Sequence, residues 1–140
     1  MHEELLQKIL KGSEHKITKG RLLIFRLLRD HPDPQTIACL VATAAGKVDR
    51  VSVYRIIELY EKLGIVKRIT TGWKYKLELS DIFLSHHHHI SCLKCGRMTA
   101  IGEDTEIEIL IEKLGNKSGF LLTSHQLELH GYCAACQNPT

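Results

Sequence analysis

The chain has 140 residues, of which 44% are hydrophobic and 25% are charged, and its formal net charge is +3. This length fits one domain or two small ones, and the composition excludes a disordered chain. No apolar run approaches the ~20 residues of a membrane span, and the acidic N-terminus lacks the apolar core of a signal peptide. We therefore expect a cytoplasmic protein that does not contact a membrane.

The charge is distributed unevenly along the chain. Residues 1–80 carry 15 Lys and Arg against 9 Asp and Glu, whereas residues 81–140 carry 4 against 7. A basic first part favours a polyanion as partner, although a solvated basic surface is the alternative. The acidic second part holds four of the five cysteines and a run of histidines, which favours metal binding and self-association.

Four short helices are predicted in the first 64 residues, because apolar residues recur there at helical spacing. Thr18 is a suitable N-cap for the second helix. Asp33 precedes Pro34 and is expected to cap the third helix, since proline suits the first helical position. Asp49 or Ser52 is expected to cap the fourth.

After Gly64 the apolar period changes to two, which predicts strands over 65–70 and 73–79 joined by a turn at Thr71-Gly72. Helices followed by a hairpin are typical of a winged helix-turn-helix, in which the fourth helix would enter the major groove of DNA. We expect an α+β protein with a DNA-binding domain over residues 1–80, a linker over 81–85 and a smaller domain over 86–140.

The smaller domain is expected to be an α/β unit. The pattern predicts strands over 86–91 and 97–101, a helix over 103–114 and a strand from Phe120 to about His130. A core of about 55 residues is marginal by itself, and a structural metal or a dimer interface is the usual remedy.

Two Cys-x-x-Cys pairs provide the most specific motif of the sequence. The pairs are Cys92 with Cys95 and Cys133 with Cys136. In a reducing compartment such pairs favour metal, and four thiolates suit tetrahedral Zn²⁺. Unligated thiols or a redox pair are the alternative. Cys39 stands in an apolar helix face and is expected to pack in the core.

Four consecutive histidines, residues 86–89, form the second metal signal. Strand side chains alternate between faces, so His86 and His88 point one way while His87 and His89 point the other. Each pair is half of a site for Zn²⁺ or Fe²⁺, and the alternative is a solvated polar strand. Other ligands available to complete these sites are His31, Glu78, Glu108 and His125.

The sequence resembles the ferric uptake regulator family of metal-responsive repressors over about residues 14–136. Five segments carry the resemblance: Lys16 to Arg21, His31-Pro32, Ser52-Val53-Tyr54-Arg55, His86 to Gly96, and His125 to Cys136. The resemblance implies a homodimer with an N-terminal winged helix and a C-terminal α/β dimerisation domain. It also implies structural Zn²⁺ on the four paired cysteines.

The resemblance further implies two other metal sites. A regulatory interdomain site carries over to His31, His87 and His89, with Glu78 as the nearest carboxylate, and would bind Fe²⁺ or Zn²⁺. A site in the dimerisation domain carries over to His86, His88, Glu108 and His125. The family often has a carboxylate at the position of Ala100, so this chain departs from the pattern there. The alternatives are that Glu103 substitutes or that the site has fewer ligands.

The function predicted from these residues is a metal-dependent repressor that binds palindromic double-stranded DNA operators as a dimer. The expected groove contacts are Tyr54 and Arg55, with Ser52 from the same motif, and the expected phosphate contacts are Lys16, Lys19 and Arg21. Two alternatives are a zinc-dependent hydrolase and a zinc-stapled protein-interaction module. No recognisable catalytic motif supports an enzyme.

Overall fold

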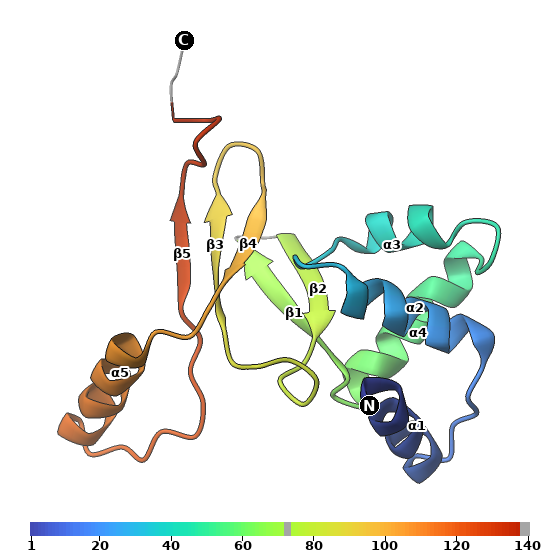
Figure 1. The fold of residues 1–140 in the computed structure, drawn as a ribbon, viewed down its shortest axis with the longest axis horizontal. Helices are drawn as coiled ribbons and strands as arrows, with labels where there is room; N and C mark the ends of the chain where they lie inside the picture. The colour runs from blue at the N-terminus through green and yellow to red at the C-terminus, as the bar shows by residue number, and fades with distance from the viewer. Residues whose placement is uncertain (72–73, 138–140) are drawn as a thin grey trace. The chain divides into compact units, whose positions relative to one another are not determined.

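The structure, a computed structural model, describes residues 1–71 and 74–137 (Figure 1). It divides into two compact units, Met1–Ser85 and His86–Thr140. None of the helices among the described residues is long and apolar enough to cross a membrane. The predicted Thr71-Gly72 turn, and the start of the strand predicted from Trp73, fall partly outside the described residues.

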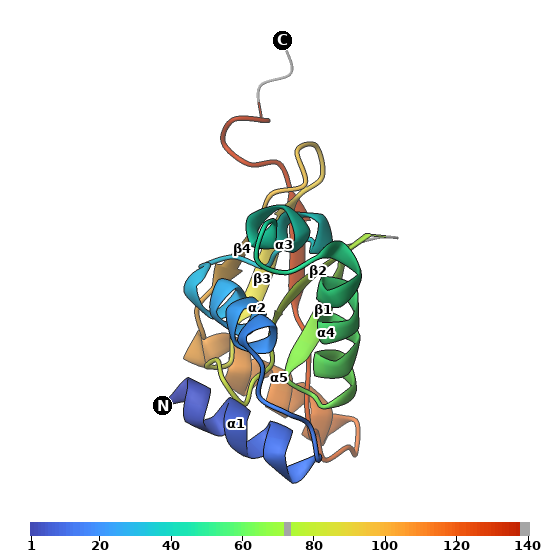
Figure 2. The ribbon, with the colours of Figure 1, turned by 90° about the vertical axis from the view of Figure 1, so that its right-hand side faces the viewer.

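The first unit is a winged helix-turn-helix, as predicted. Its elements are α1 (His2–Gly12), α2 (Lys19–Asp30), α3 (Ile37–Ala44), α4 (Arg50–Lys62), β1 (Val66–Thr71) and β2 (Lys74–Leu79). The two strands pair antiparallel, from Val66 opposite Leu79 to Thr71 opposite Lys74. Figure 2 shows α2, α3 and α4 packed together beside this hairpin.

The caps explain where the helices begin. The Thr18 side chain accepts a hydrogen bond from the Arg21 N–H, and the Asp49 side chain accepts one from the Ser52 N–H. Asp49 rather than Ser52 is therefore the N-cap of α4. This cap fixes the first turn of the predicted recognition helix.

The predicted cap of the third helix was wrong. α3 begins at Ile37, and its N-cap is Thr36, whose side chain accepts a hydrogen bond from the Cys39 N–H. The preceding residues are extended because Gln35 pairs with Leu77 of β2, with N–O distances of 2.8 and 2.6 Å. A short third strand added to the hairpin thus displaces the helix start by a turn.

The core of the first unit is built from all four helices and the hairpin. Phe25 and Tyr60 are among its largest fully buried side chains, and the Tyr60 hydroxyl donates to the Arg21 carbonyl at 2.6 Å. Phe83, within the predicted linker, is also buried there and packs edge-on against Phe25 with ring centroids 5.1 Å apart. Cys39 is exposed, contrary to expectation, because Leu40 and Ala44 are the residues of α3 that face the core.

The second unit is a three-stranded sheet with one helix. Its elements are β3 (His88–Cys92), β4 (Met98–Ile101), α5 (Thr105–Lys117) and β5 (Glu128–Gly131). The strand order is β4-β3-β5, in which β3 pairs antiparallel with β4 and parallel with β5 (Figure 1).

The long strand predicted from Phe120 to His130 was wrong over most of its length. Only Glu128–Gly131 is a strand, opposite His89–Cys92 of β3. Upstream, Gly119 has a φ of +80°, and the Leu122 side chain fills the space that a Cβ at Gly115 would occupy. The segment therefore folds back on α5 before it reaches the sheet.

Candidate metal centres and recognition helix

The four paired cysteines come together at one end of the second unit. Their sulfur atoms all lie within 4.8 Å of one another, and the Sγ atoms of Cys95 and Cys133 are 3.8 Å apart. Tetrahedral Zn²⁺ with Zn–S bonds of ~2.3 Å requires sulfur atoms ~3.8 Å apart. The cluster therefore fits a tetrahedral zinc centre.

The backbone around the cluster favours thiolates. The Cys133 N–H donates to the Cys92 Sγ at 3.4 Å, and N–H groups from Cys95 and Cys133 lower the pKa of Cys92 to about 6. In contrast, the hydrogen bond with Cys133 raises the pKa of Cys136 to about 12. Four adjacent thiols do not all ionise without a compensating cation, and a coordinating metal supplies that charge.

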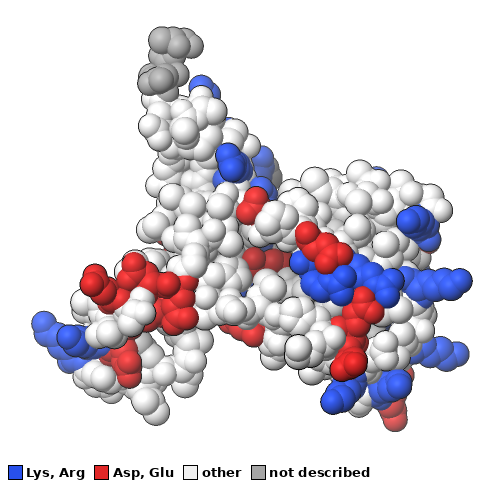
Figure 3. Space-filling model, viewed as in Figure 1, with Lys and Arg blue, Asp and Glu red and all other residues white. Residues whose placement is uncertain are grey.

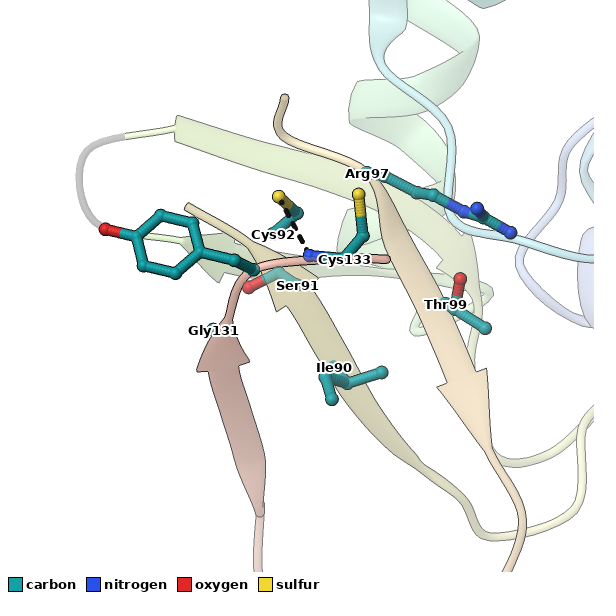
Figure 4. A pocket seen from close by; sticks show the side chains of 8 residues that line it. Ile90, Ser91, Cys92, Arg97, Thr99, Gly131 and Cys133 are labelled. Atoms are coloured by element: carbon teal, nitrogen blue, oxygen red, sulfur yellow. Dashed lines mark hydrogen bonds between the residues drawn. The ribbon is translucent and has the colours of Figure 1, made fainter. Parts of the chain in front are cut away.

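A cavity of about 220 Å³ lies beside this cluster (Figure 4). Its lining residues are Ile90, Ser91, Cys92, Arg97, Thr99, Gly131, Tyr132 and Cys133. Two of the paired cysteines belong to this lining, and their side chains lie next to each other in Figure 4. The cavity thus adjoins the cysteine centre.

A second ligand cluster lies on the other half of the same unit. His86 Nε2 and His125 Nε2 are 3.1 Å apart, and Glu108 approaches His88 Nε2 at 2.5 Å and His125 Nε2 at 2.7 Å. All four side chains offer ligand atoms within 4.8 Å of one another. Zn–N bonds of ~2.0–2.1 Å place tetrahedral ligand atoms ~3.3 Å apart. The His86–His125 separation is close to this value, whereas both Glu108 contacts are hydrogen-bond distances, so it is the donor set that suits a divalent cation.

Three different parts of the unit supply this cluster. His88 is the first residue of β3 and His86 lies just before it. Glu108 comes from the first turn of α5, and His125 from the segment before β5. His88 is 2% exposed, and its hydrogen bond is the main reason why the pKa of Glu108 is lowered. A carboxylate held ionised against imidazoles is a pre-formed ligand.

The residues predicted for the regulatory site belong to both units, His31 and Glu78 to the first and His87 and His89 to the second. His87, just before β3, and His89, within it, have ring centroids 4.8 Å apart. Glu78 is buried in β2, 3.6 Å from the Lys67 ammonium. His31 is the C-cap of α2, and its Nδ1 lies 3.2 Å from the Asp33 N–H, so a metal would bind Nε2.

The predicted DNA-contacting residues lie on the first unit. Lys16 and Lys19 are exposed before and at the start of α2, while Arg21 is half-buried and donates to the Lys16 carbonyl. Tyr54 and Arg55 are exposed on α4. Figure 3 shows that Lys and Arg gather over this unit, whereas acidic side chains gather over α5.

Comparison with known proteins decides the family. A sequence model described as the ferric uptake regulator family matches residues 12–130. The chain is 31% identical over 135 residues to the ferric uptake regulation protein of Neisseria meningitidis, covering 91% of this chain and 90% of that one. This chain belongs to the ferric uptake regulator family.

Solved structures of the family share its fold. The Helicobacter pylori ferric uptake regulator has a TM-score of 0.85 at 26% identity, and the match covers 97% of this chain and 91% of that one. The Vibrio cholerae regulator has a TM-score of 0.75 at 28% identity, covering 90% and 98%. The predicted winged helix followed by an α/β dimerisation domain is thereby confirmed.

Membership in the ferric uptake regulator family fixes the class of function. The chain is a metal-dependent DNA-binding repressor and not an enzyme, it acts as a homodimer on double-stranded DNA, and its cofactors are Zn²⁺ and a second divalent metal. The expectations on family, function, cofactors and partners are thus confirmed. The hydrolase and interaction-module alternatives do not hold.

Two details of this chain bear on the predicted ligand and contact residues. Ala100 pairs with His89 across β3 and β4, so a methyl group stands where the family often has a carboxylate. Arg50 and Val51, at the start of α4, were not among the predicted contact residues. Val51 lies three and four residues before Tyr54 and Arg55, whereas Arg50 lies four and five residues before them, so helical spacing places Val51 on their face.

Proposed function

We propose that this repressor is operated by metal bound to residues of both units. Residues 1–80 form the DNA-binding domain, 81–85 the linker and 86–140 the metal-binding dimerisation domain. The observation that carries the proposal is the pair of ligand clusters built on and beside β3, four sulfurs at one end and three imidazoles with a carboxylate at the other. The 3.8 Å between the Sγ atoms of Cys95 and Cys133 matches a tetrahedral zinc centre.

The cysteine set Cys92, Cys95, Cys133 and Cys136 would hold structural Zn²⁺. The set His86, His88, Glu108 and His125 would hold a second divalent ion, and its three imidazoles favour Zn²⁺ over harder cations. The Helicobacter pylori ferric uptake regulator has three functional metal-binding sites. This supports a third site here, on His31, Glu78, His87 and His89, as the regulatory one for Fe²⁺ or Zn²⁺.

Bound at the regulatory site, a divalent cation supplies a cross-link between side chains of the two domains. His31 and Glu78 of the DNA-binding domain would then hold one orientation relative to β3 of the dimerisation domain. Two recognition helices at a fixed spacing match the half-sites of a palindrome, whereas free domains lose ordering entropy on binding. Linkage requires that operator DNA tightens metal binding in return.

The DNA contacts are assigned from exposure and charge. Tyr54 and Arg55 would face the major groove, while Lys16, Lys19 and Arg21 would contact phosphates. Ser52 would act mainly through the helix, because its hydroxyl donates to the Asp49 carboxylate at 2.5 Å. The cytoplasm is the proposed location, since two Cys-x-x-Cys pairs persist as thiolates where thiols stay reduced.

The test is fluorescence anisotropy with the gene's own upstream region and an unrelated duplex of equal length. The zinc-loaded dimer is titrated with buffered Zn²⁺, Fe²⁺ or Mn²⁺ under reducing, oxygen-free conditions. We expect one metal to raise affinity for the upstream region alone, and to do so no longer in His89→Ala. Equal binding of both duplexes at every metal level would contradict the proposal.

The salt dependence of DNA binding tests the phosphate contacts separately. Each phosphate contact contributes about −0.9 to the slope of log K against log salt on duplex DNA. Lys19→Ala should flatten that slope and weaken all sequences alike, whereas Lys117→Ala, at the end of α5, should leave it unchanged. An unchanged slope in Lys19→Ala would remove this residue from the contacts.

A further inference from the structure

The outward face of α4 carries an apolar patch, Val51 beside Tyr54, of which the proposed contacts use only Tyr54. Val53, Ile56, Ile57 and Tyr60 are buried in the core. On the opposite face Val51 is 57% exposed and Tyr54 is 42% exposed, three residues apart on adjacent turns. Residues 51, 54 and 55 therefore share one face, and its first residue is an aliphatic side chain in water.

The first turn of α4 holds Val51 outward. The Asp49 carboxylate accepts hydrogen bonds from both the N–H and the hydroxyl of Ser52, at 3.2 and 2.5 Å. The Ser52 hydroxyl is thus occupied by the cap, and Val51 is the exposed apolar side chain of this turn, next to the exposed Arg50. A β-branched residue has low helix propensity, so helix formation does not account for its presence here.

The neighbouring residues restrict what can meet this patch. The Arg50 guanidinium lies 5.8 Å from the centre of the Tyr54 ring, and Arg55 is exposed on the same face. Two cations that flank a small apolar surface suit a polyanion with apolar groups on its surface. In the major groove, the thymine C5 methyl is such a group, and N-terminal residues of a recognition helix reach base edges.

We propose that Val51, beside Tyr54, reads thymine methyl groups in each operator half-site and so determines part of the sequence preference. This inference rests on the proposed placement of α4 in the major groove. Arg50 and Arg55 position the face on the duplex, and the isopropyl group of Val51 packs against one methyl. The preferred half-site therefore contains a thymine opposite Val51.

The experiment replaces single thymines by deoxyuridine, which removes the C5 methyl and leaves the hydrogen-bonding edge intact. The probe is a palindromic duplex selected from a random pool by the metal-loaded dimer. Burial of one methyl corresponds to about a fourfold change in affinity per half-site. We expect deoxyuridine at one symmetric pair of positions to lower the affinity of wild type by about fourfold per half-site. The same replacement should lower the affinity of Val51→Ala by less than about twofold.

Ile82→Ala is the matched control, because Ile82 is an equally exposed aliphatic residue (54%) away from α4. It should keep the wild-type deoxyuridine profile, and circular dichroism should show all variants folded. A Val51→Ala profile identical to that of wild type, or no position sensitive to the methyl, would overturn the inference and leave DNA binding intact. Failure of the wild-type protein to select any duplex would instead overturn the proposed function, and this inference with it.

Discussion

The two units of this repressor are stabilised in different ways. In the first, sixteen buried apolar side chains of the described residues, from α1 to Phe83, form one cluster. In the second, Cys92 and Met98 are the buried members of the core among the described residues, while Leu110, Leu114 and Phe120 are largely exposed. The second unit buries histidines instead, with His88 and His89 at 2% and 5% exposure. The first unit is thus stabilised by an apolar core, whereas the second relies on metal ligands and on the surface that contacts its partner.

Removal of zinc should produce the largest difference in folding stability between the two units. Zinc centres of this kind contribute on the order of 10 kcal/mol to folding, and the second unit has little apolar core to replace that contribution. Cys92→Ser should abolish hydrogen-exchange protection in β3 and β5 while α4 stays protected. Cys39→Ser, an exposed thiol outside the cluster, is the control and should change neither unit. Protection retained in β3 of Cys92→Ser would contradict a metal-dependent fold.

A cavity in the hydrocarbon core should act on the first unit alone. Phe25 is fully buried, so Phe25→Ala should lower the opening free energy of α2 and α4 by about 3–5 kcal/mol. Phe120 is 67% exposed in the second unit, and Phe120→Ala should leave that opening free energy unchanged. Native-state hydrogen exchange in urea measures both. Equal losses from the two substitutions would show that the units unfold together.

The exposed apolar side chains of α5 should matter for the dimer. Leu110 is 57% exposed, and a charge placed there faces desolvation if the partner covers it. Leu110→Glu should raise the dimer dissociation constant at least about tenfold, a change of about 1.4 kcal/mol. Lys113→Glu, an exposed position one turn on, should have a smaller effect. Sedimentation equilibrium compares them, and an unchanged constant for Leu110→Glu would place the interface elsewhere.

The smallest expected effects come from the helix caps, of which the two units offer a closely matched pair. Asp49 caps α4 in the first unit, and Asp104 caps α5 in the second by accepting from the N–H groups of Glu106 and Ile107. Each Asp→Ala substitution should lower the stability of its own unit by about 1 kcal/mol. Chemical denaturation followed by unit-specific exchange measures the effect. A loss that appears in the other unit would indicate coupling through the linker.

Local signals predicted most of this fold, and long-range pairing explains the exceptions. Thr18, Asp49 and Gly64 marked helix ends correctly because caps and positive φ depend on neighbouring residues. The start of α3 could not be predicted, since it depends on Gln35 meeting Leu77, 42 positions along the chain. The final strand was predicted too long for the same reason. Its length is set by pairing with β3 rather than by its own residues.

The candidate sites divide in the same way, into those that local spacing predicts and those that depend on long-range packing. Cys-x-x-Cys spacing identified the cysteine cluster, because each pair sits on its own turn. The convergence of Glu108 and His125 on the histidines of β3 depends on how α5 packs, and only the family resemblance supplied it. The role proposed for Val51 was not predicted from the sequence, because an aliphatic residue within a helical pattern is expected in the core.

The burial of Phe83 sets the length of the tether between the two domains. Phe83 is fixed in the first unit, and His87 follows four positions later, so the connecting chain can span at most ~14 Å. Closing so short a loop loses little chain entropy, and the effective concentration of each domain near the other is in the ~mM range. Even a modest intrinsic affinity for metal at the proposed regulatory site would therefore suffice to join the domains, and each residue added after Ser85 should weaken that response.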